Sequence, residues 1–190
     1  MDLESFKKQF RYYMLLGNKT FEQLDEKDIF WQFNEESNSI AVMVKHLHGN
    51  MLSRWTNFLT EDGEKDWRNR DDEFLSSYTY KAEMLNKWEE GWDCLFKALD
   101  TINETNKEQL LYVRNMGHTI EEACHRQLAH YAYHVGQIVY VGRMLKADKW
   151  KSSSIPKGNS EKYNQEKFSK AKEKQHFTDE LLNQDNIKEA

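Results

Sequence analysis

Apolar residues recur at intervals of three and four positions through most of the chain, the spacing that places them on one face of an α-helix. These stripes predict helices over about 3–21, 40–59 and 80–102, and a fourth helix from Thr119 to about Leu145. A single proline, eight glycines and almost no alternating β-branched pattern favour helix over sheet throughout. The sequence therefore predicts an all-α protein, with a four-helix bundle as its architecture.

The segments between the stripes differ in character. Residues 25–38 form a connection that aromatic side chains hold in place, whereas residues 60–77 form a long, charged and aperiodic connection. The segment 103–118 contains LLYV, which predicts a short extended connector. Thr119 and Glu122 fit a capping box that opens the last helix. A long ordered loop such as 60–77 is often functional, although a solvated connection is the commoner interpretation.

The composition changes sharply after Trp150, where Ser, Lys, Glu, Gln and Asn replace the apolar stripes. We interpret residues 1–150 as the folded domain and residues 151–190 as a polar C-terminal extension that is partly ordered at most. Within the extension, residues 167–174 favour no more than an isolated amphipathic turn or two.

Charge and composition exclude several classes of protein. The net charge is −5 and the lysines alternate with acids, so no nucleic-acid partner is expected. No window approaches the roughly 20 apolar residues that cross a bilayer, and the N-terminus lacks a secretory signal pattern. Cys94 and Cys124 have neither disulfide-framework nor zinc-ribbon spacing and are expected as buried thiols. These features predict a cytoplasmic protein with no membrane partner.

His130 and His134 are separated by one helical turn in HRQLAHYAYHVGQ. At about 100° per residue their side chains lie roughly 40° apart on one helix face, where both imidazoles can reach one metal ion. The spacing alone is weak evidence, because two packed core or surface histidines would produce it as well.

A third histidine on another core helix would complete a metal site, and the second helix offers two. His46 and His48 differ by about 200° around the helix axis, so only one of them faces the interior. His46 flanks the apolar stripe and is the better candidate, whereas His48 lies nearer the outward side. The remaining histidines favour surface or packing roles: His118, His125 and His176. The HExxH pattern of zinc proteases is absent, because Tyr131 follows His130.

At these positions the chain resembles the DinB-like, or YfiT-like, superfamily of bacterial metal-binding four-helix bundles. The segment NSI at 38–40 leads into VKHL at 44–47, and the pair His130 and His134 is followed by VGQI at 135–138. The resemblance spans about 3–157. It implies a three-histidine metal site formed by His46, His130 and His134, with water or a carboxylate completing the coordination shell.

The chain is more closely similar to an uncharacterised branch of that superfamily. This branch carries HLxGNxxSRW, here at 46–55, and His48 fills the variable position of the motif. It also has a charged DGEKxWRxR loop, here at 62–70, and an IPKG segment, here at 155–158. These features lie outside the histidine triad and are compatible with substrate contacts or with branch-specific packing.

The resemblance implies a function as well. Related proteins transfer a low-molecular-weight thiol, such as bacillithiol or mycothiol, and a divalent metal, zinc or nickel in the first place, would activate that thiol. Arg54, Arg68 and Arg70 are candidates to bind the thiol's carboxylates, although arginines in charged loops are usually solvated. A small-molecule substrate and a homodimer are therefore expected.

Two other functions stay open. A metal-dependent hydrolase would need a carboxylate beside the metal, which the sequence does not identify. A non-catalytic bundle with a structural or vestigial metal site would need no further residues.

Overall fold

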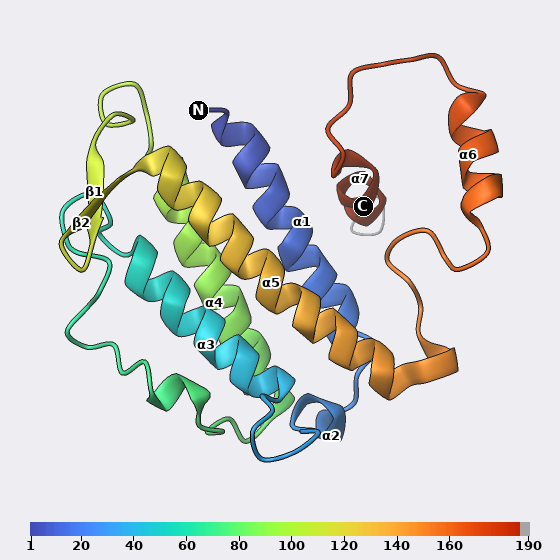
Figure 1. The fold of residues 1–190 in the computed structure, drawn as a ribbon, viewed down its shortest axis with the longest axis horizontal. Coiled ribbons are helices and arrows are strands. Elements are labelled where there is room, and N and C mark those ends of the chain that lie inside the picture. The colour runs from blue at the N-terminus through green and yellow to red at the C-terminus, as the bar shows by residue number, and fades with distance from the viewer. Residues whose placement is uncertain (187–190) are drawn as a thin grey trace.

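The computed structural model describes residues 1–186, and the chain is mostly helical (Figure 1). Four long helices lie side by side around one core: α1 (Leu3–Phe21), α3 (Ile40–Trp55), α4 (Lys81–Asp100) and α5 (Ile120–Lys146). The helix α3 packs along α4, and α1 packs along α5. The prediction of a mainly helical chain is confirmed, with one small two-stranded sheet among the described residues as an addition.

Shorter elements fill the connections and follow the last long helix. They are α2 (Glu26–Ile29), the 3-10 helix η1 (Asp72–Phe74), the strands β1 (Leu110–Val113) and β2 (Met116–Thr119), the 3-10 helix η2 (Ala147–Lys149), α6 (Ser160–Phe168) and α7 (Asp179–Asn186). The element η1 interrupts the long charged connection and packs on α3. The predicted aperiodic loop therefore contains one ordered turn that contacts a core helix.

The helix ends follow from local hydrogen bonds. The hydroxyl of Thr119 accepts from the backbone N–H of Glu122 at 3.1 Å, and the Glu122 carboxylate accepts from the N–H of Thr119 at 2.8 Å, which confirms the capping box. The helix α3 ends at Trp55 rather than at the predicted residue 59. Its end is set by Thr56, which is extended, and by Asn57, which has a positive φ of 49°.

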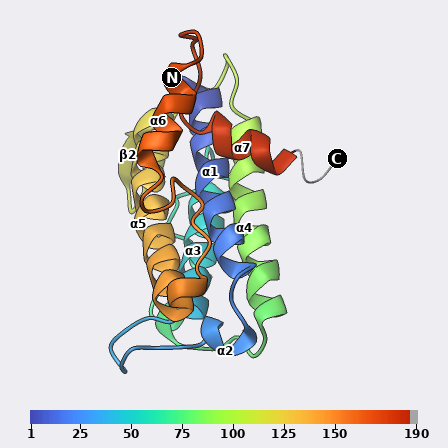
Figure 2. The same cartoon turned by 90° about the vertical axis from the view of Figure 1, so that its right-hand side faces the viewer.

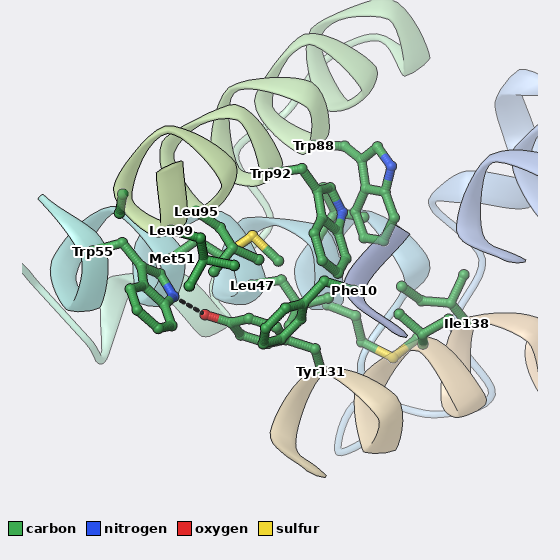
Figure 3. Close-up of a cluster of buried hydrophobic side chains, with 14 of the residues drawn as sticks. Phe10, Leu47, Met51, Trp55, Trp88, Trp92, Leu95, Leu99, Tyr131 and Ile138 are labelled. Atoms are coloured by element: carbon green, nitrogen blue, oxygen red, sulfur yellow. Dashed lines mark hydrogen bonds between the residues drawn. The ribbon is translucent and has the colours of Figure 1, made fainter. Parts of the chain in front are cut away.

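Aromatic rings dominate the centre of the core (Figure 3). Trp92 of α4 is in contact with Trp88, Phe10 and Tyr131, at ring-centroid distances of 5.3, 6.5 and 5.6 Å. The Trp55 indole N–H donates to the Tyr131 hydroxyl at 3.0 Å, so these two buried polar groups are paired. Tyr131 lies on α5 between the two candidate metal ligands, and the core therefore anchors the segment of α5 that carries them.

A two-residue turn joins β1 and β2 into a hairpin. The strands pair antiparallel, with Val113 opposite Met116, and Arg114 and Asn115 both have positive φ, at 54° and 60°. The carboxylate of Asp62 accepts from the backbone N–H groups of Arg114 and Asn115, at 2.8 and 2.9 Å. The extended character predicted for LLYV is confirmed, and the hairpin is tied to the start of the charged connection.

The C-terminal extension crosses the outer side of α1, as Figure 2 shows. Lys8 of α1 forms an ion pair with Asp179 of α7 at 2.7 Å, and the hydroxyl of Ser5 lies 3.0 Å from His176 Nε2. The helix α6 ends at Phe168 and is followed by a turn in which the Lys170 N–H donates to the Lys167 carbonyl at 3.2 Å, so only the start of 167–174 forms a turn. The division at residue 150 stays a prediction. Among the described residues, no helix combines the length and the apolarity that a membrane span requires.

Candidate metal site

Three histidines from two helices converge between α3 and α5. The two helices lie side by side and run in opposite directions, with His46 on α3 and His130 and His134 on α5 (Figure 1). Each of the three rings offers a nitrogen, and these nitrogens all lie within 4.8 Å of one another. The structure thus brings together the three histidines that the sequence analysis selected.

The geometry of the rings fits a single tetrahedral ion. The ring centroids are 4.7 to 5.2 Å apart, and each ring contributes one nitrogen to the group of candidate ligand atoms. The Nε2 atoms of His46 and His130 are 3.2 Å apart. Two imidazole nitrogens bound at 2.0–2.1 Å to a tetrahedral zinc ion would be about 3.3 Å apart. The two helices therefore hold this pair of ligand atoms at close to the required separation.

Hydrogen bonds at the other ring nitrogens orient two of the histidines. His46 Nδ1 lies 2.9 Å from Glu73 Oε2, and His134 Nδ1 lies 3.0 Å from Gln137 Oε1. Each of these oxygens accepts a hydrogen bond from Nδ1–H, and in that tautomer the lone pair of Nε2 is free to bind a cation. This arrangement, an imidazole between a metal and a carboxylate or carbonyl oxygen, is common at metal sites in proteins.

Glu73 is the residue that sequence reasoning missed. It lies in η1, within the charged connection, and its side chain is buried against α3. Arg68 of the same connection binds both of its carboxylate oxygens, Nε to Oε1 at 2.7 Å and Nη2 to Oε2 at 3.0 Å. Nothing in the pattern of 60–77 distinguishes Glu73 from the other acids there. The one available signal is Gly49, a glycine inside a helix and opposite this loop.

Burial keeps the α5 histidines neutral. Desolvation, followed by the nearby rings of His134 and His46, lowers the pKa of His130 to about 3. Desolvation and the ring of His46 lower the pKa of His134 to about 4. Burial alone would raise the pKa of Glu73, but hydrogen bonds from His46 and Arg68 hold it below its usual range. The site at neutral pH therefore offers neutral imidazoles at His130 and His134, the form that binds metal.

The other histidines lie apart from this group. His48, on the same helix as His46, faces α4, where its Nε2 is 3.2 Å from a carboxylate oxygen of Glu90. His125 is exposed and packs edge to face on Phe6, with centroids 4.8 Å apart. His176 contacts Ser5 at the start of α1. The structure brings His46, and not His48, to the other two histidines, but the expected outward position of His48 is wrong, because its side chain is only 14% exposed and lies against α4.

The three candidate arginines occupy different environments. Arg68 is occupied by Glu73, and its side chain is only 2% exposed. Arg54 donates to the backbone carbonyl of Gly63 and lies 3.4 Å from a carboxylate oxygen of Glu64. The guanidinium of Arg70 lies over the Phe74 ring at 5.4 Å. Arg54 and Arg68 are both near enough to contribute to the depressed pKa of His130. Each of the three arginines also has a partner within the protein.

The ring of Phe74 covers one side of the triad. It stacks on His46 with centroids 4.8 Å apart and an interplanar angle of 27°. Because Phe74 follows Glu73 directly, the same turn supplies both the carboxylate behind His46 and the apolar cover on its face. The charged connection therefore contributes to the site as much as the helices do.

The fold and the site together define a mainly helical protein with a candidate three-histidine metal centre. The chain belongs to the family described as "Protein of unknown function (DUF1572)", which matches residues 2–159. The match includes the four long helices, the charged connection and all three histidines, and it ends before α6 and α7. No curated protein and no solved structure matches the chain.

Proposed function

We propose that this chain binds a divalent transition metal through His46, His130 and His134. The observation that carries the proposal is the convergence of three imidazoles from two helices, with their nitrogens within 4.8 Å of one another. Zinc and nickel are the metals we favour, because imidazole suits both and neither needs a soft thiolate ligand. Three protein ligands leave a coordination position open, which is typical of catalytic rather than structural sites.

The proposal extends to the superfamily. We infer that the chain is a DinB-like four-helix bundle formed by α1, α3, α4 and α5, and that it acts as a homodimer. Support comes from the motifs at 38–47 and 130–138, which carry the resemblance, and from the four long helices around one core. The positions of the histidines, one on the second long helix and two on the last, agree with the same assignment.

We further propose that the activity is the transfer of a low-molecular-weight thiol of the bacillithiol type to a small electrophile. A bound divalent cation lowers the pKa of a thiol and so supplies a thiolate nucleophile at neutral pH. His130 is neutral, and the negative charge of Glu73 is balanced by Arg68, so neither group balances the positive charge of such a cation. A cation bound here would therefore favour an anionic ligand. In the transfer, the sulfur bonds to an electrophilic carbon as the leaving group departs with the bonding pair.

Hydrolysis ranks second because it needs a carboxylate base beside the attacking water. Glu73 is the carboxylate that touches the triad, and both of its oxygens are already bonded, to His46 and to Arg68. Among the described residues, the group of converging ligand atoms contains histidine nitrogens alone. Glu73 is therefore a poor candidate for the base that hydrolysis needs.

The proposal is tested on three untagged proteins: the wild type, His130→Ala and His48→Ala. Metal content after purification and zinc affinity by competition with a chromophoric chelator are measured first. We expect one metal per chain in the wild type and in His48→Ala, and loss of stoichiometric binding in His130→Ala. Equal binding by all three proteins would refute the three-histidine site.

The activity is tested on the same three proteins with bacillithiol and a haloaromatic electrophile. Turnover by the wild type and His48→Ala, without turnover by His130→Ala, is the expected result. Metal binding without turnover, together with unfolding on chelation, would instead assign the metal a structural role. Turnover of an ester in the absence of any thiol would favour the hydrolase.

A further inference from the structure

A buried chain of three side chains lies behind His46. The side chains of His46, Glu73 and Arg68 are 6%, 7% and 2% exposed, and the carboxylate lies between the imidazole and the guanidinium. Glu73 Oε2 receives bonds from both neighbours, and Oε1 receives the second bond from Arg68. Because both oxygens of this buried carboxylate accept hydrogen bonds from fixed donor groups, the carboxylate has one orientation.

The backbone of α3 is shaped to admit this carboxylate. A Cβ atom placed on Gly49 would lie 2.3 Å from Glu73 Oε1 and 2.8 Å from its carboxyl carbon, closer than real atoms approach. Glycine in a helix interior is destabilising relative to alanine. A glycine at this position therefore has a local reason, the close passage of Glu73 on its way to His46.

We propose that Glu73, held by Arg68 and admitted by Gly49, is a positioning residue for the metal site: it fixes His46 as the tautomer protonated at Nδ1, with Nε2 toward the metal. The inference rests on the proposed metal site and adds the residues that orient one of its ligands. By the same geometry Glu73 is neither a metal ligand nor a free base, because its oxygens are bonded to His46 and Arg68.

The same helix contains a matched pair for comparison. His48 also lies beside a carboxylate, that of Glu90, but this glutamate side chain is 48% exposed and also pairs with Lys87. Among the described residues, the ion-pair partners of Glu90 are His48 and Lys87, neither of which belongs to the triad. Replacing Glu90 therefore tests the loss of a histidine–carboxylate pair on α3 without touching the site.

The first experiment measures zinc affinity by chelator competition for the wild type, Glu73→Gln and Glu90→Gln. Residues that orient a metal-bound histidine typically contribute about 10- to 100-fold in affinity. We expect a loss of that size for Glu73→Gln, whose amide would place N–H groups against Arg68, and no change for Glu90→Gln. The absorption spectrum of the cobalt-loaded protein should change in Glu73→Gln alone.

A second pair of variants reaches Glu73 from the helix side. Gly49→Ala should displace the carboxylate and weaken zinc binding by a similar factor, whereas Gly136→Ala, on α5, has open space around its new methyl group and should not. This pair keeps the test decisive if Glu73→Gln folds poorly. Thermal unfolding of each metal-free variant shows whether the fold is intact.

The tautomer of His46 gives a readout that needs no metal. Long-range nitrogen–proton NMR spectra of the metal-free wild type should show His46 protonated at Nδ1, and Glu73→Ala, which removes the acceptor altogether, should lose that preference. If the wild type binds no zinc, the proposed function fails whatever the tautomer. If the wild type binds zinc and folded Glu73→Gln and Gly49→Ala bind it equally well, the metal site stands and the positioning role is refuted.

Discussion

The two sides of α3 are held by different kinds of contact. On the side facing α4 the contact is apolar and close, since a Cβ on Gly91 would lie 3.0 Å from the sulfur of Met51 and 3.4 Å from the Cα of His48. On the side facing α5 the contact is largely polar, with His46 beside His130 and Asn50 accepting from Tyr131. The first side supplies cohesion, and the second supplies the candidate chemistry.

This difference has an energetic consequence. Apolar burial is non-directional, so the α4 side tolerates any set of side chains with suitable volume. The α5 side depends on donors and acceptors in fixed places, and several of them come from outside the two helices. We expect substitutions on the α4 side to change stability without changing metal affinity, and substitutions around His46 to do the reverse.

The largest loss of stability should follow from Met51→Ala on the α4 side. Met51 is 1% exposed and fills the space against Gly91, so its truncation leaves a cavity. We expect the free energy of unfolding of the metal-free protein to fall by about 2 to 5 kcal/mol, measured by urea denaturation. The folded variant should keep wild-type zinc affinity; a loss as large as that of His130→Ala would show that the two sides of α3 are not separable.

A smaller loss should follow from adding a methyl group on the same side. Gly91→Ala forces the new Cβ against Met51 and the backbone of α3, which should cost about 1 to 3 kcal/mol in urea denaturation. Gly136→Ala is the matched helical control and should be neutral or slightly stabilising, because glycine is the poorer helix former. Equal stability of the two variants would contradict the close approach of α3 and α4.

The apolar side was also the part that the sequence could predict. The stripe through Met43, Leu47 and Met51 follows the helical period, and its burial on α3 is confirmed. The convergence of His46, His130 and His134 followed from one helical turn and one choice of helix face, with the resemblance supporting the third residue. Local periodicity was enough for the stripe, which concerns one face of one helix, whereas the triad spans two helices and also needed the resemblance.

The rest depended on contacts that no local pattern encodes. Glu73 and Arg68 lie in a charged connection in which ten of the eighteen residues at 60–77 are acids or bases, so composition cannot select them. Asp62 likewise tethers the β1–β2 turn across more than 50 positions, through backbone N–H groups. The motif HLxGNxxSRW becomes intelligible only with the fold: Gly49 admits Glu73, Asn50 binds Tyr131, and Trp55 donates to the same tyrosine.

Tyr131→Phe tests the polar side of α3 with a smaller change. The hydroxyl accepts from Trp55 at 3.0 Å and donates to Asn50 at 3.3 Å, so its removal leaves a buried indole N–H without its partner. We expect a loss of about 1 to 2 kcal/mol in the free energy of unfolding, measured by urea denaturation. Because the ring stays in place between Phe10 and Trp92, zinc affinity should be unchanged. A gain in stability would mean that this hydroxyl is not satisfied in the folded protein.

The smallest effect at neutral pH, and one that grows with acid, should be the proton linkage of the α5 histidines in the metal-free protein. The pKa values of His130 and His134 are lowered by burial to about 3 and about 4, from an ordinary value of 6.5. Above pH 6.5 both histidines are neutral in the folded and the unfolded chain, so they make no difference to stability. As the pH falls from about 6.5 toward 4 and then 3, the two histidines become protonated in the unfolded chain before they do so in the folded chain. Stability is therefore lost across that window.

Urea denaturation in the presence of a chelator, repeated from pH 7.5 to 4.5, measures this slope. His130→Ala removes one of the two histidines that bind a proton more readily in the unfolded chain. Its stability should therefore fall less steeply with acid than that of the wild type, whatever its stability at neutral pH. The same slope in both proteins would mean that His130 accepts a proton in the folded chain as readily as in the unfolded one. The α5 side of α3 would then be open to water, and its histidines would no longer contrast with the buried contact of Met51 and Gly91 on the α4 side.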